Sequence, residues 1–343
     1  MKRVFLCCLF LSSTFVIVSI KKEIISVRQY ERSSQFALLE PDYDRNKVVV
    51  NSVVDSKPSR YISYITDGEK NRYVIKQKRK DSIRKQFQVI AEEMTGHIAE
   101  MVGIPAHRVR TLRAGMVFSG KIMPDKAASI LTFVPGIPVG EISSGPYSAL
   151  DLRQSNSSAL PKEKQGLHKG VIANMGLHPD LALIAALDTF LGIKGRGPAN
   201  YFYDKNPNFV YGEEPDRFYM IDGDKIYNSN GGKELISKIA CDQIRAMLRT
   251  KKIFRQNELQ GLHLYKKTLQ QLVELFPPAR IHELMDEFSA ASGFKKTYLP
   301  EIESRVGRIK ATIERSHQHI LELIDLLSKL IDFGRKNGSV RRR

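Results

Sequence analysis

Asp188-Thr-Phe-Leu-Gly-Ile-Lys-Gly-Arg-Gly-Pro-Ala-Asn200 and Ile221-Asp222-Gly223-Asp224 are the two most informative segments of this chain. An apolar run over 181–191 predicts a buried helix, and the Gly-rich loop after it delivers Asn200 to a predicted strand at 201–203. A second predicted strand, 217–221, ends at Asp222. An amide oxygen and a carboxylate at neighbouring strand ends are hard oxygen ligands that suit Mg²⁺, and they equally suit two turns without a metal.

The order and spacing of these residues resemble the protein-kinase-like superfamily, in particular its phosphatidylinositol 3-/4-kinase-like branch. The chain also resembles the related bacterial toxin kinases and actin-fragmin-type kinases. The branch has a loop Asp-x-Leu-Ile-Gly-Asn-x-Asp-Arg-His-x-x-Asn and then a strand ending in Ile-Asp. Asp188, Arg196 and Asn200 fall on the first Asp, the Arg and the last Asn of the loop. Asp222 falls on the Asp after the strand. The resemblance spans roughly residues 55–290, and it implies that Asn200 and Asp222 bind Mg²⁺ and that Arg196 belongs to the catalytic loop.

Earlier in the chain, charged residues fall where this family binds ATP. Lys76 ends a predicted strand and matches the lysine that holds the nucleotide phosphates. Glu92, on a helix predicted over 84–102, matches the glutamate that pairs with this lysine, and Glu93 is the neighbouring candidate. The resemblance further implies a hinge whose backbone binds the adenine, formed by Thr132, Phe133 and Val134. The implied cofactors are ATP and Mg²⁺.

The catalytic-like loop departs from the family's pattern. Gly195 stands where the family has the Asp that accepts or orients the proton of the attacking hydroxyl, and Gly197 replaces the His. Because glycine has no group that can take a proton, the sequence predicts nucleotide binding with impaired transfer. Asp188 and Asp224 are the nearby carboxylates. Asp188 is either a substitute base or a buttress of the loop.

The expected fold is α+β, a two-lobed protein-kinase-like fold with an antiparallel N-lobe sheet, one main N-lobe helix and a mainly helical C-lobe. Asp67-Gly68, between β-rich stretches, predicts the hairpin that covers the nucleotide. Near-heptad apolar spacing from Ile302 to Leu330 predicts a long amphipathic helix, which packs on its own domain or pairs with a partner helix. The expected boundaries are 1–22 for a signal peptide or membrane anchor, 23–134 for the N-lobe, 135–295 for the C-lobe, 296–334 for the amphipathic helix and 335–343 for a basic, disordered tail.

Charge and the N-terminal segment bear on partners and location. The formal net charge is +17, which attracts polyanions such as nucleotides and anionic lipid headgroups. No recognisable nucleic-acid motif accompanies the charge, so nucleic acid is not an expected partner. Lys2-Arg3 followed by an apolar run over 4–20 predicts export or membrane attachment, with a cytoplasmic protein as the alternative. The basic run at 76–85 is either a contact for an anionic membrane surface or a solvated loop.

Three functions remain open from the sequence. The first is a phosphatidylinositol-kinase-like phosphotransferase that binds Mg-ATP, with impaired or atypical transfer to a protein or a phosphoinositide. The second is an inactive pseudokinase that serves as a scaffold for a partner. The third is a helical membrane-associated protein unrelated to kinases. The third requires Lys76, Asn200 and Asp222 to lie far apart, whereas the first two require them to converge on one cleft.

Overall fold

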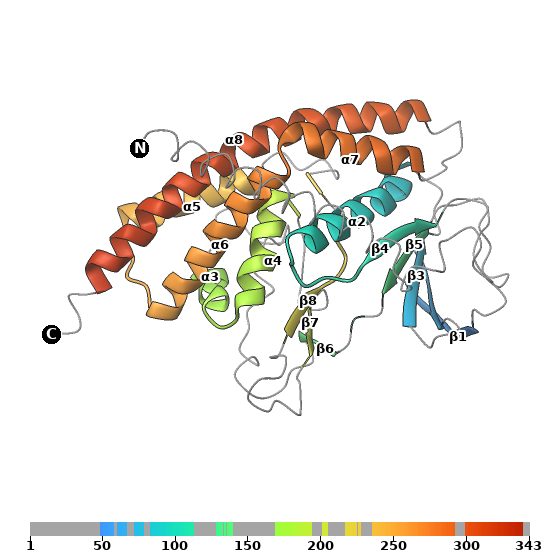
Figure 1. Ribbon diagram of the computed structural model, residues 1–343, viewed down its shortest axis with the longest axis horizontal. Helices are drawn as coiled ribbons and strands as arrows, with labels where there is room; N and C mark the ends of the chain where they lie inside the picture. Colours follow the sequence, from blue (N-terminus) through green and yellow to red (C-terminus); the bar gives the residue numbers. More distant parts are fainter. Residues whose placement is uncertain are drawn as a thin grey trace, which may run out of the picture. The chain divides into compact units, whose positions relative to one another are not determined.

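A computed structural model gives the fold of the chain (Figure 1). The residues that it describes are 49–57, 60–66, 72–78, 83–112, 128–132, 134, 136–139, 169–193, 201–204, 217–224, 226–227, 235–291 and 299–338. The chain divides into two compact units, the first formed by Met1–Val49 and Thr66–Asn71 and the second by Val50–Ile65 and Arg72–Arg343. Of the first unit only Val49 and Thr66 lie among the described residues, so the described fold is essentially that of the second unit.

Five strands form one sheet in the first half of the chain. They are β1 (Val49–Lys57), β2 (Arg60–Thr66), β3 (Arg72–Lys78), β4 (Val109–Leu112) and β5 (Ala128–Thr132). Their order across the sheet is β1-β2-β3-β5-β4, and both β3 and β4 pair antiparallel with β5. The two stretches predicted as hairpin arms are therefore adjacent strands, β2 and β3. The turn at Asp67-Gly68 itself lies outside the described residues.

One long helix, α2 (Ile83–Met101), connects β3 to β4 and packs on β4 and β5. Its apolar positions recur at helical spacing and are buried, among them Phe87, Ile90, Met94 and Ile98. The turn after the helix contains Gly103, whose φ of 70° is the left-handed conformation that glycine adopts without a Cβ penalty. The backbone N–H of Gly103 bonds Glu100 O at 3.2 Å, and the N–H of Ile104 bonds Ala99 O at 2.8 Å, so the last turn is closed.

The second half of the described chain is mainly helical. Its helices are α3 (Lys169–Met175), α4 (Pro179–Phe190), α5 (Ile236–Arg249), α6 (Gln256–Leu275), α7 (Pro278–Ala291) and α8 (Leu299–Gly338). A small sheet of order β6-β7-β8 accompanies them, formed by β6 (Ile137–Pro138), β7 (Tyr201–Asp204) and β8 (Arg217–Met220). Helix α4 is apolar on nearly all sides and is buried, with α6 as its main neighbour. The two halves meet through α2, which also contacts α7 and α8.

The long helix α8 packs on α5, α6 and α7 of its own chain (Figure 1). Its near-heptad apolar residues are buried, from Val306 to Ile331. Ser316 interrupts the apolar pattern, and its hydroxyl lies 3.1 Å from the hydroxyl of Ser237 on α5, so the polar group is paired inside the core. This arrangement corresponds to the first alternative drawn from the sequence, a helix packed on its own domain.

The expected α+β class is confirmed: a sheet with one main helix precedes a mainly helical part. The predicted disordered tail at 335–343 is wrong for its first four residues, because α8 continues to Gly338. Arg335 and Lys336 lie in its last turn, where cations are favourable for the helix dipole. The predicted N-terminal signal or anchor at 1–22 lies outside the described residues. Within the described part of the chain, no helix is both long and apolar enough to cross a bilayer.

Candidate nucleotide and metal site

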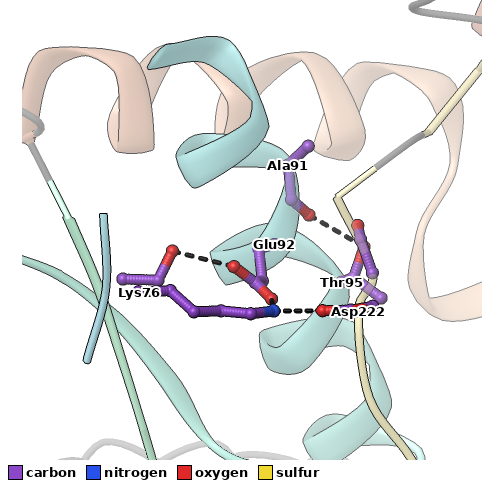
Figure 2. A network of polar contacts seen from close by, with 7 residues as sticks. Lys76, Ala91, Glu92, Thr95 and Asp222 are labelled. Atoms are coloured by element: carbon purple, nitrogen blue, oxygen red, sulfur yellow. Dashed lines mark hydrogen bonds and ion pairs between the residues drawn. The ribbon is translucent and has the colours of Figure 1, made fainter. Parts of the chain in front are cut away.

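Three charged side chains from three different elements meet at one point. Lys76 lies on β3, Glu92 on α2 and Asp222 directly after β8. Lys76 Nζ donates a hydrogen bond to Glu92 Oε1 at 2.5 Å and another to Asp222 Oδ1. Figure 2 shows the lysine side chain reaching between the two carboxylates. The structure thus brings together residues that lie 16 and 146 positions apart in the sequence.

The ion pair of Lys76 with Glu92 is almost completely buried, since the two side chains are 9% and 1% exposed. Burial by itself would lower the pKa of Lys76, but the charges and hydrogen bonds of Glu92 and Asp222 outweigh burial and raise the pKa above its ordinary value. Lys76 is therefore a cation at neutral pH. Its charge is held in place by two carboxylates, which leave it little freedom to move.

Glu92, and not Glu93, is the partner of Lys76. The second oxygen of Glu92, Oε2, accepts a hydrogen bond at 2.9 Å from Ser129 Oγ on β5, and Ser129 is the residue paired with Lys76 across the two strands. Glu93 Oε2 instead accepts the backbone N–H of Thr111 on β4 at 3.1 Å. Both glutamates fix α2 to the sheet, but only Glu92 reaches the lysine.

Asp222 is placed by the strand before it and by its own backbone conformation. The N–H of Met220 bonds Pro105 O at 3.0 Å, which ties the end of β8 to the segment after α2. Asp222 then has a φ of 61°, a left-handed conformation that Asp tolerates better than most residues. Its side chain is 20% exposed, more than that of Lys76 or Glu92. Of the three side chains, that of Asp222 is the most exposed and that of Glu92 the least.

The start of α4 fixes β8 and hence the segment that carries Asp222. Asp180, buried in the first turn of α4, accepts hydrogen bonds from the backbone N–H of Phe218 at 2.9 Å and from Arg217 Nε at 3.0 Å. His178 caps the helix because its Nδ1 accepts the N–H of Asp180 at 3.2 Å. These contacts connect the helix before the predicted catalytic-like loop to the strand before Asp222.

The end of α4 carries Asp188, which is completely buried. Its backbone carbonyl accepts the N–H of Ile193 at 2.8 Å across Gly192, whose φ is 61°. The N–H of Tyr227 bonds Leu191 O at 2.7 Å, so the chain after Asp222 is tied back to the helix end. A carboxylate buried to this degree offers no open oxygen to a substrate hydroxyl, which favours the buttress over the substitute base for Asp188.

The predicted adenine hinge falls at the end of β5. The backbone N–H of Thr132 is donated to Arg108 O at 3.0 Å, and Thr132 Oγ1 accepts the N–H of Arg108 at 2.9 Å. The amide hydrogen of Thr132 is thus used inside the protein and is not offered to a base. Val134 is buried, and Phe133 lies outside the described residues.

Several predicted residues lie outside the described part of the chain. These are Arg196 and Asn200, together with the substituted positions Gly195 and Gly197. Asp224 is described and buried.

The basic run at 76–85 is not one continuous surface, because Lys76 and Gln77 are buried.

A metal held by protein ligands alone does not fit the described residues, which contain no group of three or more His, Cys, Asp or Glu able to hold an ion. Mg²⁺ commonly binds through one or two carboxylates, with substrate phosphates and water as the remaining ligands. Asp222, a partly exposed carboxylate beside a fixed ammonium, fits that second mode. The donor set therefore suits Mg²⁺ that arrives with a nucleotide.

Sequence reasoning missed three residues that build the site. Ser129 and Asp180 hold Glu92 and β8, respectively. Thr95 Oγ1 lies 2.8 Å from Gly223 O, beside Asp222. One signal was present for Ser129, a lone polar residue beside Ile130 and Leu131 on a buried strand. Thr95 and Asp180 make contacts across 128 and 38 positions of sequence, which no local pattern indicates.

Comparisons with known proteins add little detail. No family model matches the sequence, and no curated protein matches it. Among solved structures, a Rio2 kinase–ADP/Mg²⁺–phosphoaspartate complex from Chaetomium thermophilum aligns with 76% of this chain and 72% of its own, at 13% identity and a TM-score of 0.33. The MAP kinase LmaMPK10 from Leishmania major aligns over 84% of both chains, at 12% identity and a TM-score of 0.32.

The kinase-like resemblance predicts three features that the structure has. They are a sheet with a single helix, a helical second half and a buried ion pair between β3 and α2. The described residues have an α+β fold, in the arrangement that the kinase-like resemblance predicts.

Proposed function

We propose that this chain binds Mg-ATP at the Lys76–Glu92–Asp222 site and is a kinase-like phosphotransferase-fold protein with impaired or atypical transfer. The observation that carries the proposal is the buried lysine held between two carboxylates that come from separate elements. Burying two opposite charges stabilises a fold weakly at best, because desolvation offsets their attraction. A site that must receive phosphates supplies a reason to keep this arrangement.

The residues divide the work according to their burial. Glu92 is buried and bonded to both Lys76 and Ser129, so it keeps the ammonium in place. Lys76 would hold the nucleotide phosphates, for which a compact ammonium is a suitable point charge. Asp222, partly exposed, would bind the metal together with Asn200. The bound Mg²⁺ would neutralise phosphate charge, as such ions do in phosphoryl transfer.

Transfer itself is expected to be slow. Gly195 replaces the residue that would take or orient the acceptor's proton, and Asp188 is buried. General base catalysis typically contributes about 10²–10⁴-fold to a rate. Positioning and charge stabilisation can still support a residual reaction.

Gly195 also favours a second candidate, a pseudokinase in which the nucleotide stabilises a scaffold. The two candidates differ in how they respond to Gly195→Asp. An impaired enzyme should transfer phosphate faster by about 10²-fold or more when a carboxylate is restored. A scaffold without an acceptor site should show no phosphate transfer in the parent or in Gly195→Asp. Transfer is measured with radiolabelled ATP and purified full-length protein.

The finer assignments belong to the same proposal. The loop and the strand end at Asp222 are most similar to the phosphatidylinositol-kinase-like branch, so the acceptor would be a protein or a phosphoinositide. The apolar N-terminal segment and the net charge of +17 support contact with an anionic membrane. Of the basic run, only the residues after Gln77 remain for such a contact.

The test is the thermal stability of the full-length protein with and without Mg-ATP, compared with Asp222→Ala. A ligand that binds only the folded state stabilises it, by about 2.7 kcal/mol at a hundredfold excess over its Kd. Asp325→Ala is the matched control, because Asp325 is an exposed carboxylate paired with Lys329 on α8.

Mg-ATP should raise the Tm of the parent and of the control, and it should leave Asp222→Ala nearly unchanged. If millimolar Mg-ATP shifts none of the three proteins, the chain has the fold without this ligand. The proposal is then wrong.

A further inference from the structure

Thr95 connects the helix that carries Glu92 to the loop that carries Asp222. It lies on α2 one turn after Glu92 and is completely buried. Its Oγ1 lies 2.8 Å from Ala91 O in its own helix, and Figure 2 shows these two residues. The same Oγ1 lies 2.8 Å from Gly223 O in the loop. A hydroxyl has one hydrogen, so this hydrogen is shared between the two carbonyl oxygens.

The contact between Thr95 and Gly223 is also tight in its packing. A Cβ added to Gly223 would lie 2.4 Å from Thr95 Cγ2 and 2.6 Å from Thr95 Cβ, closer than real side chains approach. Glycine is therefore required at this position, which follows the left-handed backbone of Asp222. The loop is pressed against one face of α2 at the residue after the proposed metal ligand.

We propose that Thr95 is a positioning residue, which fixes the backbone after Asp222 against α2 and so couples metal binding at Asp222 to the Lys76–Glu92 pair. The proposal rests on the proposed function and extends it to a residue outside the charged triad. Thr95 and Glu92 share a face of α2 because they are three positions apart. A movement of α2 that breaks the ion pair therefore also releases Gly223, and a free loop no longer holds the Asp222 carboxylate.

This coupling predicts a specific separation of effects in nucleotide binding. Thr95→Val keeps the shape of the side chain and removes the hydrogen that Gly223 O receives. Affinity for ATP in the presence of Mg²⁺ should fall about tenfold, the size of one buried hydrogen bond. With EDTA in place of Mg²⁺, the affinity for ATP depends on Lys76, and that of Thr95→Val should stay within about twofold of the parent value. Thr95→Ser keeps a hydroxyl and should recover most of the Mg²⁺-dependent affinity.

The matched control is Thr268→Val on α6. Thr268 is buried, and its Oγ1 donates to Leu264 O at 2.9 Å, the same bond within a helix that Thr95 makes to Ala91. Thr268→Val should therefore lower stability slightly and leave the Mg²⁺ dependence of ATP binding unchanged. If Thr95→Val binds Mg-ATP as the parent does, or if Thr95→Ser is as weak as Thr95→Val, Thr95 does not position Asp222.

A measurement without nucleotide separates this inference from the proposed function. Hydrogen exchange of the full-length protein should become faster at residues 221–224 in Thr95→Val and unchanged there in Thr268→Val. If exchange at 221–224 does not change in Thr95→Val, the coupling is wrong even where ATP binds. If the parent binds no ATP but exchange responds as expected, the proposed function fails and the structural coupling stands.

Discussion

Helices α2 and α8 are both long and amphipathic, yet they bury very different side chains. The buried face of α8 is apolar from Val306 to Ile331 apart from Ser316, which is paired with Ser237. The buried part of α2 contains four polar or charged residues, namely Gln88, Glu92, Glu93 and Thr95. Burial of polar groups is unfavourable unless each finds a partner, and three of these four bond to the sheet or to the loop after β8.

The difference shows which part of the molecule holds the fold and which part builds the site. Apolar burial on α8 stabilises the helical half. On α2, the buried carboxylates and the hydroxyl contribute little net stability but fix the directions of Lys76 and Asp222. Under the proposed function, the buried polar residues of α2 serve nucleotide binding at some loss of stability, whereas the buried face of α8 serves stability.

The largest expected effect comes from breaking the buried ion pair on one side only. Glu92→Leu leaves the buried ammonium of Lys76 with Asp222 alone, and we expect a loss of about 3–5 kcal/mol in the free energy of unfolding. The double variant Lys76→Met/Glu92→Leu removes both charges and should recover most of this loss. Urea denaturation of the two variants measures the difference. If the double variant is as unstable as the single one, the pair does stabilise the fold, and the contrast with α8 is lost.

Shortening a core side chain on α8 should have the next largest effect. Leu327 is completely buried, so Leu327→Ala should lower the free energy of unfolding by about 2–5 kcal/mol without changing Mg-ATP affinity. Leu321, on the same helix, is 49% exposed, and Leu321→Ala should change stability by less than about 0.5 kcal/mol. Equal losses in the two variants, measured by denaturation, would contradict the assignment of the buried face.

A smaller effect is expected from His97, which lies on α2 against Phe288 of α7. Burial, and then the charges of Arg110 and Arg280, lower the pKa of His97 to about 4. Between about pH 6.5 and 4 the unfolded chain binds a proton that the folded chain does not. The free energy of unfolding should therefore decrease as the pH is lowered through this window, by at most about 3 kcal/mol.

The variant His97→Gln should lose less stability than the parent between pH 7 and pH 4, and His263→Gln, at an exposed position on α6, should follow the parent. Thermal denaturation at several pH values measures this. If the stability of His97→Gln depends on pH as steeply as that of the parent, His97 is not the source of the pH dependence.

The sequence was sufficient for the elements with strong periodicity and for residues that carry the family resemblance. Helices α2 and α4 begin and end close to their predicted bounds, because Gly103 and Gly192 close them with left-handed turns. The family resemblance pairs Lys76 with Glu92, and spacing favours Glu92 over Glu93; the structure brings the side chains of Lys76 and Glu92 together. The roles of both residues, and the expected lobe boundaries, remain predictions.

The sequence was insufficient where geometry depends on distant partners. Asp180 looks like an ordinary acidic residue at a helix start, and only the fold shows that it holds β8. Thr95 is one hydroxyl on an amphipathic helix, and its contact with Gly223 depends on how β8 ends. The basic composition of residues 335–343 predicts a disordered tail. The same cations are also favourable at a helix C-terminus, where Arg335 and Lys336 lie.

The most direct test of the account is a crystal structure of the full-length protein with Mg²⁺ and a non-hydrolysable ATP analogue. We expect phosphate oxygens within hydrogen-bond distance of Lys76 Nζ and the metal bound to the Asp222 carboxylate, with Glu92 still paired to Lys76. A nucleotide bound elsewhere, or crystals grown at saturating analogue in which Lys76 remains bonded to both carboxylates and no nucleotide is present, would contradict it.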